Sequence, residues 1–160
     1  MNADIFTAEK AGIPKVKIAG RATFAAAPAL REFVKSVEQE NNVSAVEVNL
    51  TECTGMDSTF MGILAMLALK ARKRNFPVKV INPGTNKKLL DGLGLSKMFE
   101  YMDIEQPDAD SWRKTSVDVE NPQNNAKTVL DAHQVLMEAD ENNVEKFKNV
   151  VDMVKKDIEK

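Results

Sequence analysis

An acid and two hydroxyl groups stand side by side in the segment GMDSTFMGILAML, which spans residues 55–67. Asp57, Ser58 and Thr59 come directly before a long apolar run, so they lie where a helix is expected to begin. A side-chain oxygen at such a position accepts a hydrogen bond from a free backbone N–H, and Asp57 or Ser58 could supply it. Because capping requires only one of the three side chains, it leaves a hydroxyl group for other chemistry.

A hydroxyl group at the start of this helix suits a protein kinase, because it would be exposed and rigidly held at the rim of a sheet. A phosphate on it would meet free backbone N–H groups and the positive end of the helix dipole, so the helix would not unfold. The phosphate would instead repel acidic or apolar groups of a protein that docks there. The segment therefore favours two interpretations, plain helix capping and phosphorylation that controls docking.

The helix expected from about Ser58 to Arg74 has two apolar faces. The face expected to pack on a sheet comprises Phe60, Ile63, Leu64, Leu67 and Ala71. The opposite face comprises Met61, Gly62, Ala65 and Leu69. A helix that covers one side of a sheet normally has polar residues on its outer face. An apolar outer face needs a cover, which could be the C-terminal part of the chain, a partner protein, or both at different times.

The sequence contains few residues suited to metal binding, nucleophilic catalysis or nucleotide binding. The chain has one cysteine and one histidine, Cys53 and His133, which cannot supply a typical zinc site and lie far apart in sequence for a nucleophile pair. The segment NPGTNKK at residues 82–88 lacks the first glycine and the Gly-Lys-Ser/Thr end of a phosphate-binding loop. We therefore expect no catalytic residue, no metal and no cofactor, and hence no enzyme.

Composition indicates a soluble globular protein. The 160 residues are 43% hydrophobic and 29% charged, and the net charge of −2 gives no general attraction to nucleic acid or to an acidic membrane. The most apolar stretch, residues 60–69, is about half as long as a membrane crossing, and no basic-then-apolar signal peptide opens the chain. A single cysteine fits a reducing compartment. We expect a cytoplasmic protein without membrane insertion.

The remaining pattern predicts the elements that position these residues. Strands are expected at residues 5–9, 16–19, 43–50, 76–81 and 99–102, and helices at residues 24–40, 58–74 and 85–93. Thr23 is the possible N-cap of the first helix, a turn is expected at residues 11–14, and a polar loop at residues 51–56. The order β-β-α-β-α-β-α-β predicts a mixed sheet packed with helices.

The composition changes after residue 105. Residues 106–125 are polar with two prolines, which predicts a linker or strap, and Trp112 is expected to anchor it on the domain. Apolar stripes in residues 126–160 predict a helical hairpin. His133 lies within the first stripe, which is typical of a buried histidine with a satisfied ring; a ligand or pH-sensing role is the alternative. We thus expect a domain at residues 1–105, a linker at 106–125 and a hairpin at 126–160.

These motifs resemble the STAS domain of bacterial anti-sigma-factor antagonists. In that family an apolar strand and a short loop lead to Asp-Ser-Ser/Thr-Gly-x-Gly and an apolar helix; Asp57, Ser58, Thr59 and Gly62 match this pattern, and Phe60 departs from it. The segment KVINPGTNKKLLDGLGLSKMFEYM, residues 79–102, resembles the family's later strand, helix, Gly-Leu-x-x-x-Phe and final strand. The resemblance covers roughly residues 4–106. It implies an α/β fold, a STAS-type mixed β-sheet packed with α-helices, here followed by a C-terminal α-helical hairpin.

The resemblance also implies a partner-switching regulator of transcription. The unmodified protein would bind an anti-sigma factor that is also a serine kinase of the HATPase type, and a sigma factor would be released. The kinase would phosphorylate Ser58, with Thr59 as the secondary candidate, and a PP2C-type phosphatase would reverse this. Asp57 would shape the loop and cap the helix. The expected partner surface comprises Met56, Asp57, Ser58, Thr59, Met61, Gly62, Ala65 and Leu69.

The C-terminal hairpin lies outside the basic family domain, which leaves its role open. It could form a homodimer, or it could compete with the partner for the apolar helix face. The alternative function is therefore a non-catalytic STAS scaffold or assembly protein that works through its C-terminal helices without a phosphorylation switch.

Overall fold

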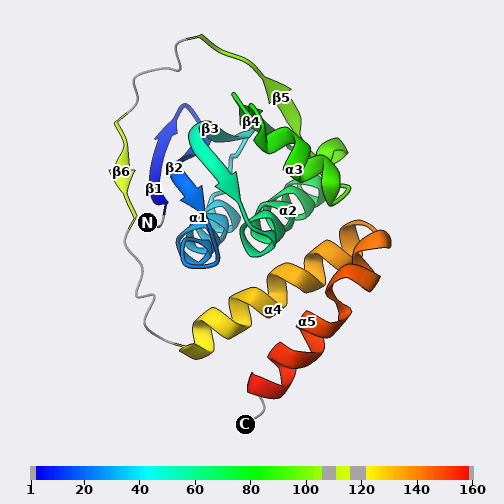
Figure 1. Ribbon diagram of the computed structural model, residues 1–160. Helices are drawn as coiled ribbons and strands as arrows, with labels where there is room; N and C mark the ends of the chain where they lie inside the picture. Colours follow the sequence, from blue (N-terminus) through cyan, green and yellow to red (C-terminus); the bar gives the residue numbers. More distant parts are fainter. Residues whose placement is uncertain (1–2, 106–110, 116–121, 159–160) are drawn as a thin grey trace.

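A computed structural model describes residues 3–105, 111–115 and 122–158 (Figure 1). Its elements are, in order, β1 (Asp4–Lys10), β2 (Ile13–Ala22), α1 (Ala27–Gln39), β3 (Val46–Met56), α2 (Ser58–Lys73), β4 (Val78–Ile81), α3 (Asn86–Gly92), the 3-10 helix η1 (Ser96–Met98), β5 (Glu100–Met102), β6 (Arg113–Lys114), α4 (Pro122–Ala139) and α5 (Asn142–Ile158). In these ranges of the chain, no helix combines the length and the apolar character needed to cross a bilayer.

The strands form one mixed sheet in the order β5-β4-β3-β2-β1-β6. The strands from β2 through β3 and β4 to β5 pair in parallel, whereas β1 is antiparallel to β2 and β6 is antiparallel to β1. This arrangement confirms the mixed α/β sheet that the alternation of strands and helices predicted.

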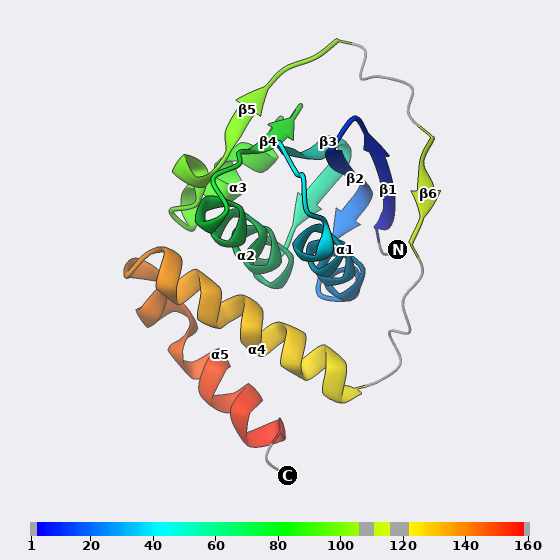
Figure 2. The same cartoon turned by 180° about the vertical axis from the view of Figure 1, so that it is seen from behind.

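The two faces of the sheet differ, because successive side chains of a strand point to opposite faces. In β2, Val16 and Ile18 are fully buried in the hydrophobic core. The neighbouring Lys15 instead pairs with Glu47 of β3, with 3.7 Å between Nζ and Oε1. Helices α1 and α2 lie side by side on the same side of the sheet, so the sheet forms one layer and these helices the next (Figures 1 and 2).

The prediction of a polar loop at residues 51–56 is wrong, because these residues belong to β3. Strand β3 continues to Met56 because its pairing with β2 runs on from Ala19–Glu52 to Ala22–Met56, with a shift of register on the way. The polar and glycine-containing sequence hides this extension, since irregular pairing tolerates residues that are rare in regular strands. Strand β3 therefore delivers the chain directly to Asp57 and the start of α2.

Other boundaries also differ from prediction: β3 begins at Val46 rather than at residue 43, and β4 begins at Val78 rather than at residue 76. Helix α1 begins at Ala27, with a proline in its first turn, and Thr23 does not cap it. The Thr23 hydroxyl instead accepts a hydrogen bond from the backbone N–H of Ala25 in the preceding turn, at 3.3 Å. The turn between β1 and β2 needs only Ala11 and Gly12, both with positive φ, so residues 13 and 14 already belong to β2.

The predicted strap is described only in part, because residues 106–110 and 116–121 lie outside the described ranges. Its short strand β6 pairs with the outer edge of β1. The Lys17 ammonium group lies 5.0 Å from the centroid of the Trp112 ring, a cation–π contact that attaches this segment to the sheet. Helix α4 begins at Pro122 rather than at the predicted residue 126.

Helices α4 and α5 form the predicted hairpin and add two further layers. Helix α4 runs across the outer side of α1 and α2, and α5 lies beyond α4 (Figure 2). Asn143, at the start of α5, is fully buried and donates from Nδ2 to the carbonyl oxygens of Leu93 and Leu136, at 2.9 and 2.8 Å. The Asn143 side chain therefore joins the hairpin turn to the segment that follows α3.

Replacing Asn143 with alanine should lower the free energy of unfolding by about 1–2 kcal/mol, because the Leu93 carbonyl loses its Asn143 donor while the Leu136 carbonyl keeps the backbone N–H of Asp140. Urea denaturation followed by circular dichroism measures this change. The control is Asn142→Ala, which alters an exposed neighbour and should change stability by less than about 0.5 kcal/mol. Equal stability of the two variants would contradict the role given to Asn143.

Candidate functional site at the start of helix α2

The carboxylate of Asp57 fixes the start of α2. Its Oδ1 accepts a hydrogen bond from the backbone N–H of Phe60 at 2.9 Å, which makes Asp57 the N-cap of the helix. Its Oδ2 accepts another from the backbone N–H of Phe24 at 2.7 Å. One side chain thus holds both the helix start and the loop between β2 and α1, so Ser58 is placed on a rigid base.

The hydroxyl of Ser58 meets a residue of the C-terminal hairpin. Ser58 Oγ lies 2.9 Å from Nε2 of His133 in α4, and Nδ1 of the same ring lies 2.7 Å from the carbonyl oxygen of Val129. A carbonyl oxygen only accepts hydrogen bonds, so Nδ1 carries a hydrogen. In the neutral imidazole, Nε2 is then the acceptor and the Ser58 hydroxyl is the donor.

His133 is enclosed on its other side by α5. Its side chain is 3% exposed, and its ring packs edge-on against Phe147, with 4.8 Å between the ring centroids. The structure therefore agrees with the expectation of a buried histidine with a satisfied ring. Sequence reasoning missed its partner, because nothing in the local pattern joins Ser58 to a residue in a separate helix.

Helices α2 and α4 pack closely against each other at Gly62. A Cβ atom built on Gly62 would lie 2.4 Å from the carbonyl oxygen of Ala132, which is far inside van der Waals contact. Ala132 is itself fully buried. The absence of a side chain at Gly62 thus lets the backbone of α4 lie directly on α2, and it brings His133 over Ser58.

The apolar outer face predicted for α2 is covered by this contact. Of the residues expected to bind a partner, four hydrophobic or small ones are buried: Met56, Met61, Gly62 and Ala65. Thr59 is also buried, with 5% exposure. Asp57, Ser58 and Leu69 are partly exposed. The hairpin contacts this predicted surface at Ser58, through His133, and at Gly62, against Ala132.

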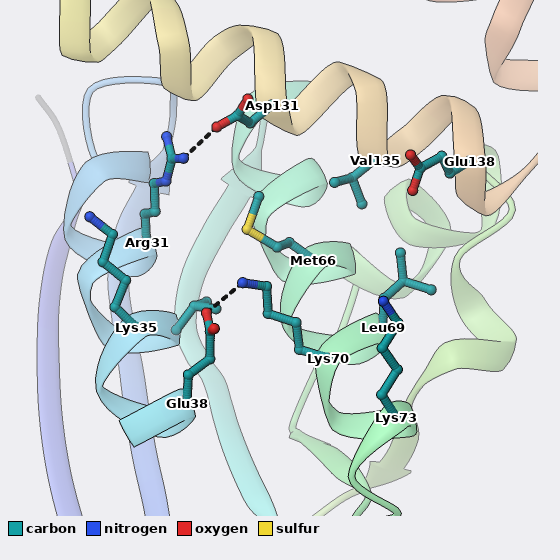
Figure 3. A pocket seen from close by; sticks show the side chains of 11 residues that line it. Arg31, Lys35, Glu38, Met66, Leu69, Lys70, Lys73, Asp131, Val135 and Glu138 are labelled. Atoms are coloured by element: carbon teal, nitrogen blue, oxygen red, sulfur yellow. Dashed lines mark hydrogen bonds and ion pairs between the residues drawn. The ribbon is translucent and has the colours of Figure 1, made fainter. Parts of the chain in front are cut away.

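Leu69 lines a groove of about 520 Å³ between α1, α2 and α4 (Figure 3). Its apolar lining comes from Val34, Met66, Leu69 and Val135. Charged side chains surround it, and two oppositely charged pairs, Arg31–Asp131 and Lys70–Glu38, bridge neighbouring helices. Arg31 and Lys70 thus already have anionic partners, and Lys35, Lys73 and Glu138 also line the groove.

Cys53 does not form a nucleophile pair with His133, whose ring nitrogens are bonded to Ser58 and Val129. Burial raises the pKa of the Cys53 thiol above its ordinary value, which disfavours the reactive thiolate. Among the described residues, no cluster of three or more histidine, cysteine, aspartate or glutamate side chains could hold a metal ion.

Comparisons with solved structures identify the fold. The chain is similar to SpoIIAA, an anti-sigma factor antagonist, in its unphosphorylated form (16% identity, TM-score 0.52, covering 62% of this chain and 88% of that one). It is also similar to the Bacillus cell fate determinant SpoIIAA in the phosphorylated form (18% identity, TM-score 0.52, covering 63% of this chain and 92% of that one). The chain is similar as well to an anti-sigma factor antagonist from Mycobacterium paratuberculosis, with 23% sequence identity and a TM-score of 0.52. The match covers 62% of this chain and 85% of that one.

A search of curated proteins found no significant match. The family model described as "Mlab, STAS domain" matches residues 5–106, which include Asp57, Ser58 and the whole of α2 but end before α4. This match spans most of the chain and agrees with the fold of the similar structures. The chain therefore belongs to the STAS_2 family of STAS domains and carries α4 and α5 beyond the family domain.

Proposed function

We propose that this protein is a phosphorylation-controlled binding module, whose unmodified form captures a partner protein through α2 and whose Ser58 is the phosphate acceptor. The partner is an anti-sigma factor with serine kinase activity of the HATPase type, and a PP2C-type phosphatase restores the unmodified form. The observation that carries the proposal is the position of the Ser58 hydroxyl, held by the Asp57 cap beside an apolar helix face in a STAS domain.

The geometry favours Ser58 over Thr59 as the acceptor. Ser58 is partly exposed and its Oγ points away from the sheet toward α4, whereas Thr59 is 5% exposed. In the reaction, the kinase transfers the γ-phosphoryl group of ATP to Oγ, and the hydroxyl proton leaves to a base of the kinase. The chain itself supplies the acceptor and performs no catalysis.

A phosphate on Ser58 would act on docking through charge and desolvation. The outer face of α2 next to it is formed by Met61, Gly62 and Ala65, so a partner must bring apolar groups close to this end of the helix. A phosphate carries a charge of about −1.5 to −2 at neutral pH and resists removal from water. Binding of an apolar or acidic partner surface would therefore weaken after phosphorylation.

Mass spectrometry of the full-length chain recovered from its native cell tests this function by reading the phosphosite and the captured proteins together. Ser58→Ala should lose the phosphopeptide and keep the kinase partner, and Ser58→Asp should reduce capture at least tenfold. Thr59→Val, which removes the neighbouring hydroxyl with little change of shape, should leave both unchanged. Phosphate found only at another residue, or capture unaffected by Ser58→Asp, would favour the scaffold function instead.

The supporting role of Asp57 gives a separate prediction. Asp57→Ala removes the acceptor for two backbone N–H groups and should lower the free energy of unfolding by about 1–2 kcal/mol. Asp57→Asn keeps one carbonyl oxygen as an acceptor, so its free energy of unfolding should fall by roughly half as much as that of Asp57→Ala. Urea denaturation measures both variants. Wild-type stability of Asp57→Ala would show that the cap does not hold this site.

A further inference from the structure

We infer that the hairpin of α4 and α5 is an intramolecular lid that closes the Ser58 site, and that it must leave α2 before a kinase or a partner gains access. The inference rests on the proposed function, because it concerns the same hydroxyl and the same helix face. Its occupant is a defined segment of this chain, already seated on the surface that the partner would use.

The closed hairpin crowds the hydroxyl of Ser58, although the residue itself is partly exposed. The Oγ atom is 2.9 Å from Nε2 of His133, whose ring is 3% exposed, so a phosphate on Oγ would have to displace this ring. Phosphorylation would also remove the hydrogen by which the hydroxyl donates to Nε2. The closed state therefore excludes the modified serine, and a phosphorylated chain would hold its lid open.

Two glycines of the STAS domain, Gly62 and Gly94, lie directly against the hairpin. At Gly62, a Cβ would meet the backbone carbonyl of Ala132 at 2.4 Å. At Gly94, after α3, a Cβ would lie 1.8 Å from Oδ2 of Asp140 in the hairpin turn. The backbone contact at Gly62 indicates a specific closed arrangement rather than a loose tail, whereas the Asp140 side chain can move and the φ of +70° at Gly94 itself favours glycine.

The two sides of α2 differ in a way that suits opening. The side that packs into the domain core is apolar, with Phe60, Ile63 and Leu64 fully buried. The interface with the hairpin combines two fully buried apolar residues, Ala132 and Leu136, with the buried polar ring of His133. The His133 ring and the Ser58 hydroxyl regain hydrogen bonds to water when the interface opens, which offsets part of the cost of exposing its apolar groups. The family model ends at residue 106, before the hairpin.

Reaction of a thiol at position 58 with the chromogenic disulfide DTNB tests the lid without any kinase. In the full chain, Ser58→Cys should react slowly, and the unmodified chain with its buried Cys53 provides the blank. Adding Ala132→Glu places a carboxylate against Gly62, where it has no room, and should raise the rate at least tenfold. Adding Lys127→Glu, on the exposed side of the same helix, is the matched control and should leave the rate unchanged.

A second variant opens the lid from the domain side. Gly62→Ala in the Ser58→Cys chain should also raise the rate at least tenfold, because its Cβ displaces α4 while alanine favours the α2 helix itself. Gly92→Ala adds a Cβ that meets nothing within 4 Å and is the control. Equal rates in Ser58→Cys alone and with either opening variant would overturn the lid. If the rate rises as expected but no phosphate is found on Ser58 in cells, the result supports the lid and contradicts the proposed phosphorylation.

Discussion

The packing of α4 on the outer face of α2 is the contact on which the rest of the account depends. An apolar helix face cannot be left in water without cost, and Met61, Gly62 and Ala65 make such a face on the side of α2 away from the sheet. The missing side chain at Gly62 allows backbone contact with Ala132. That approach in turn places His133 within hydrogen-bonding distance of Ser58, so one helix crossing both completes the fold and covers the site.

Much of α2 could be predicted from local sequence. The spacing of its apolar residues gave both faces, and the acid before the helix gave the Asp57 cap, because these features depend on helical geometry alone. The contact between Ser58 and His133 could not be predicted, since it joins residues 75 positions apart and depends on how two helices cross. The extension of β3 to Met56 was missed for a similar reason, because irregular pairing with β2 decides it and local strand propensity does not.

The STAS domain and the hairpin contribute different things to this protein. The domain supplies a sheet, a core and a rigidly capped helix start, and the similar solved structures support this fold. The hairpin packs on the outer side of α2 and is also held on α1 by polar contacts of Arg31 with Asp131 and Thr128. Under the proposed lid, the apparent affinity for a partner is the intrinsic affinity multiplied by the fraction of chains in the open state.

The central claim is that the hairpin covers Ser58 in the resting, unmodified chain. Nuclear magnetic resonance of the full chain with labelled histidine tests this most directly, because His133 is the only histidine in the sequence. The account predicts a ring with a hydrogen on Nδ1 and a nuclear Overhauser effect between the ring and the β-protons of Ser58. A rapidly reorienting ring with no such effect, as in a free tail, would contradict it.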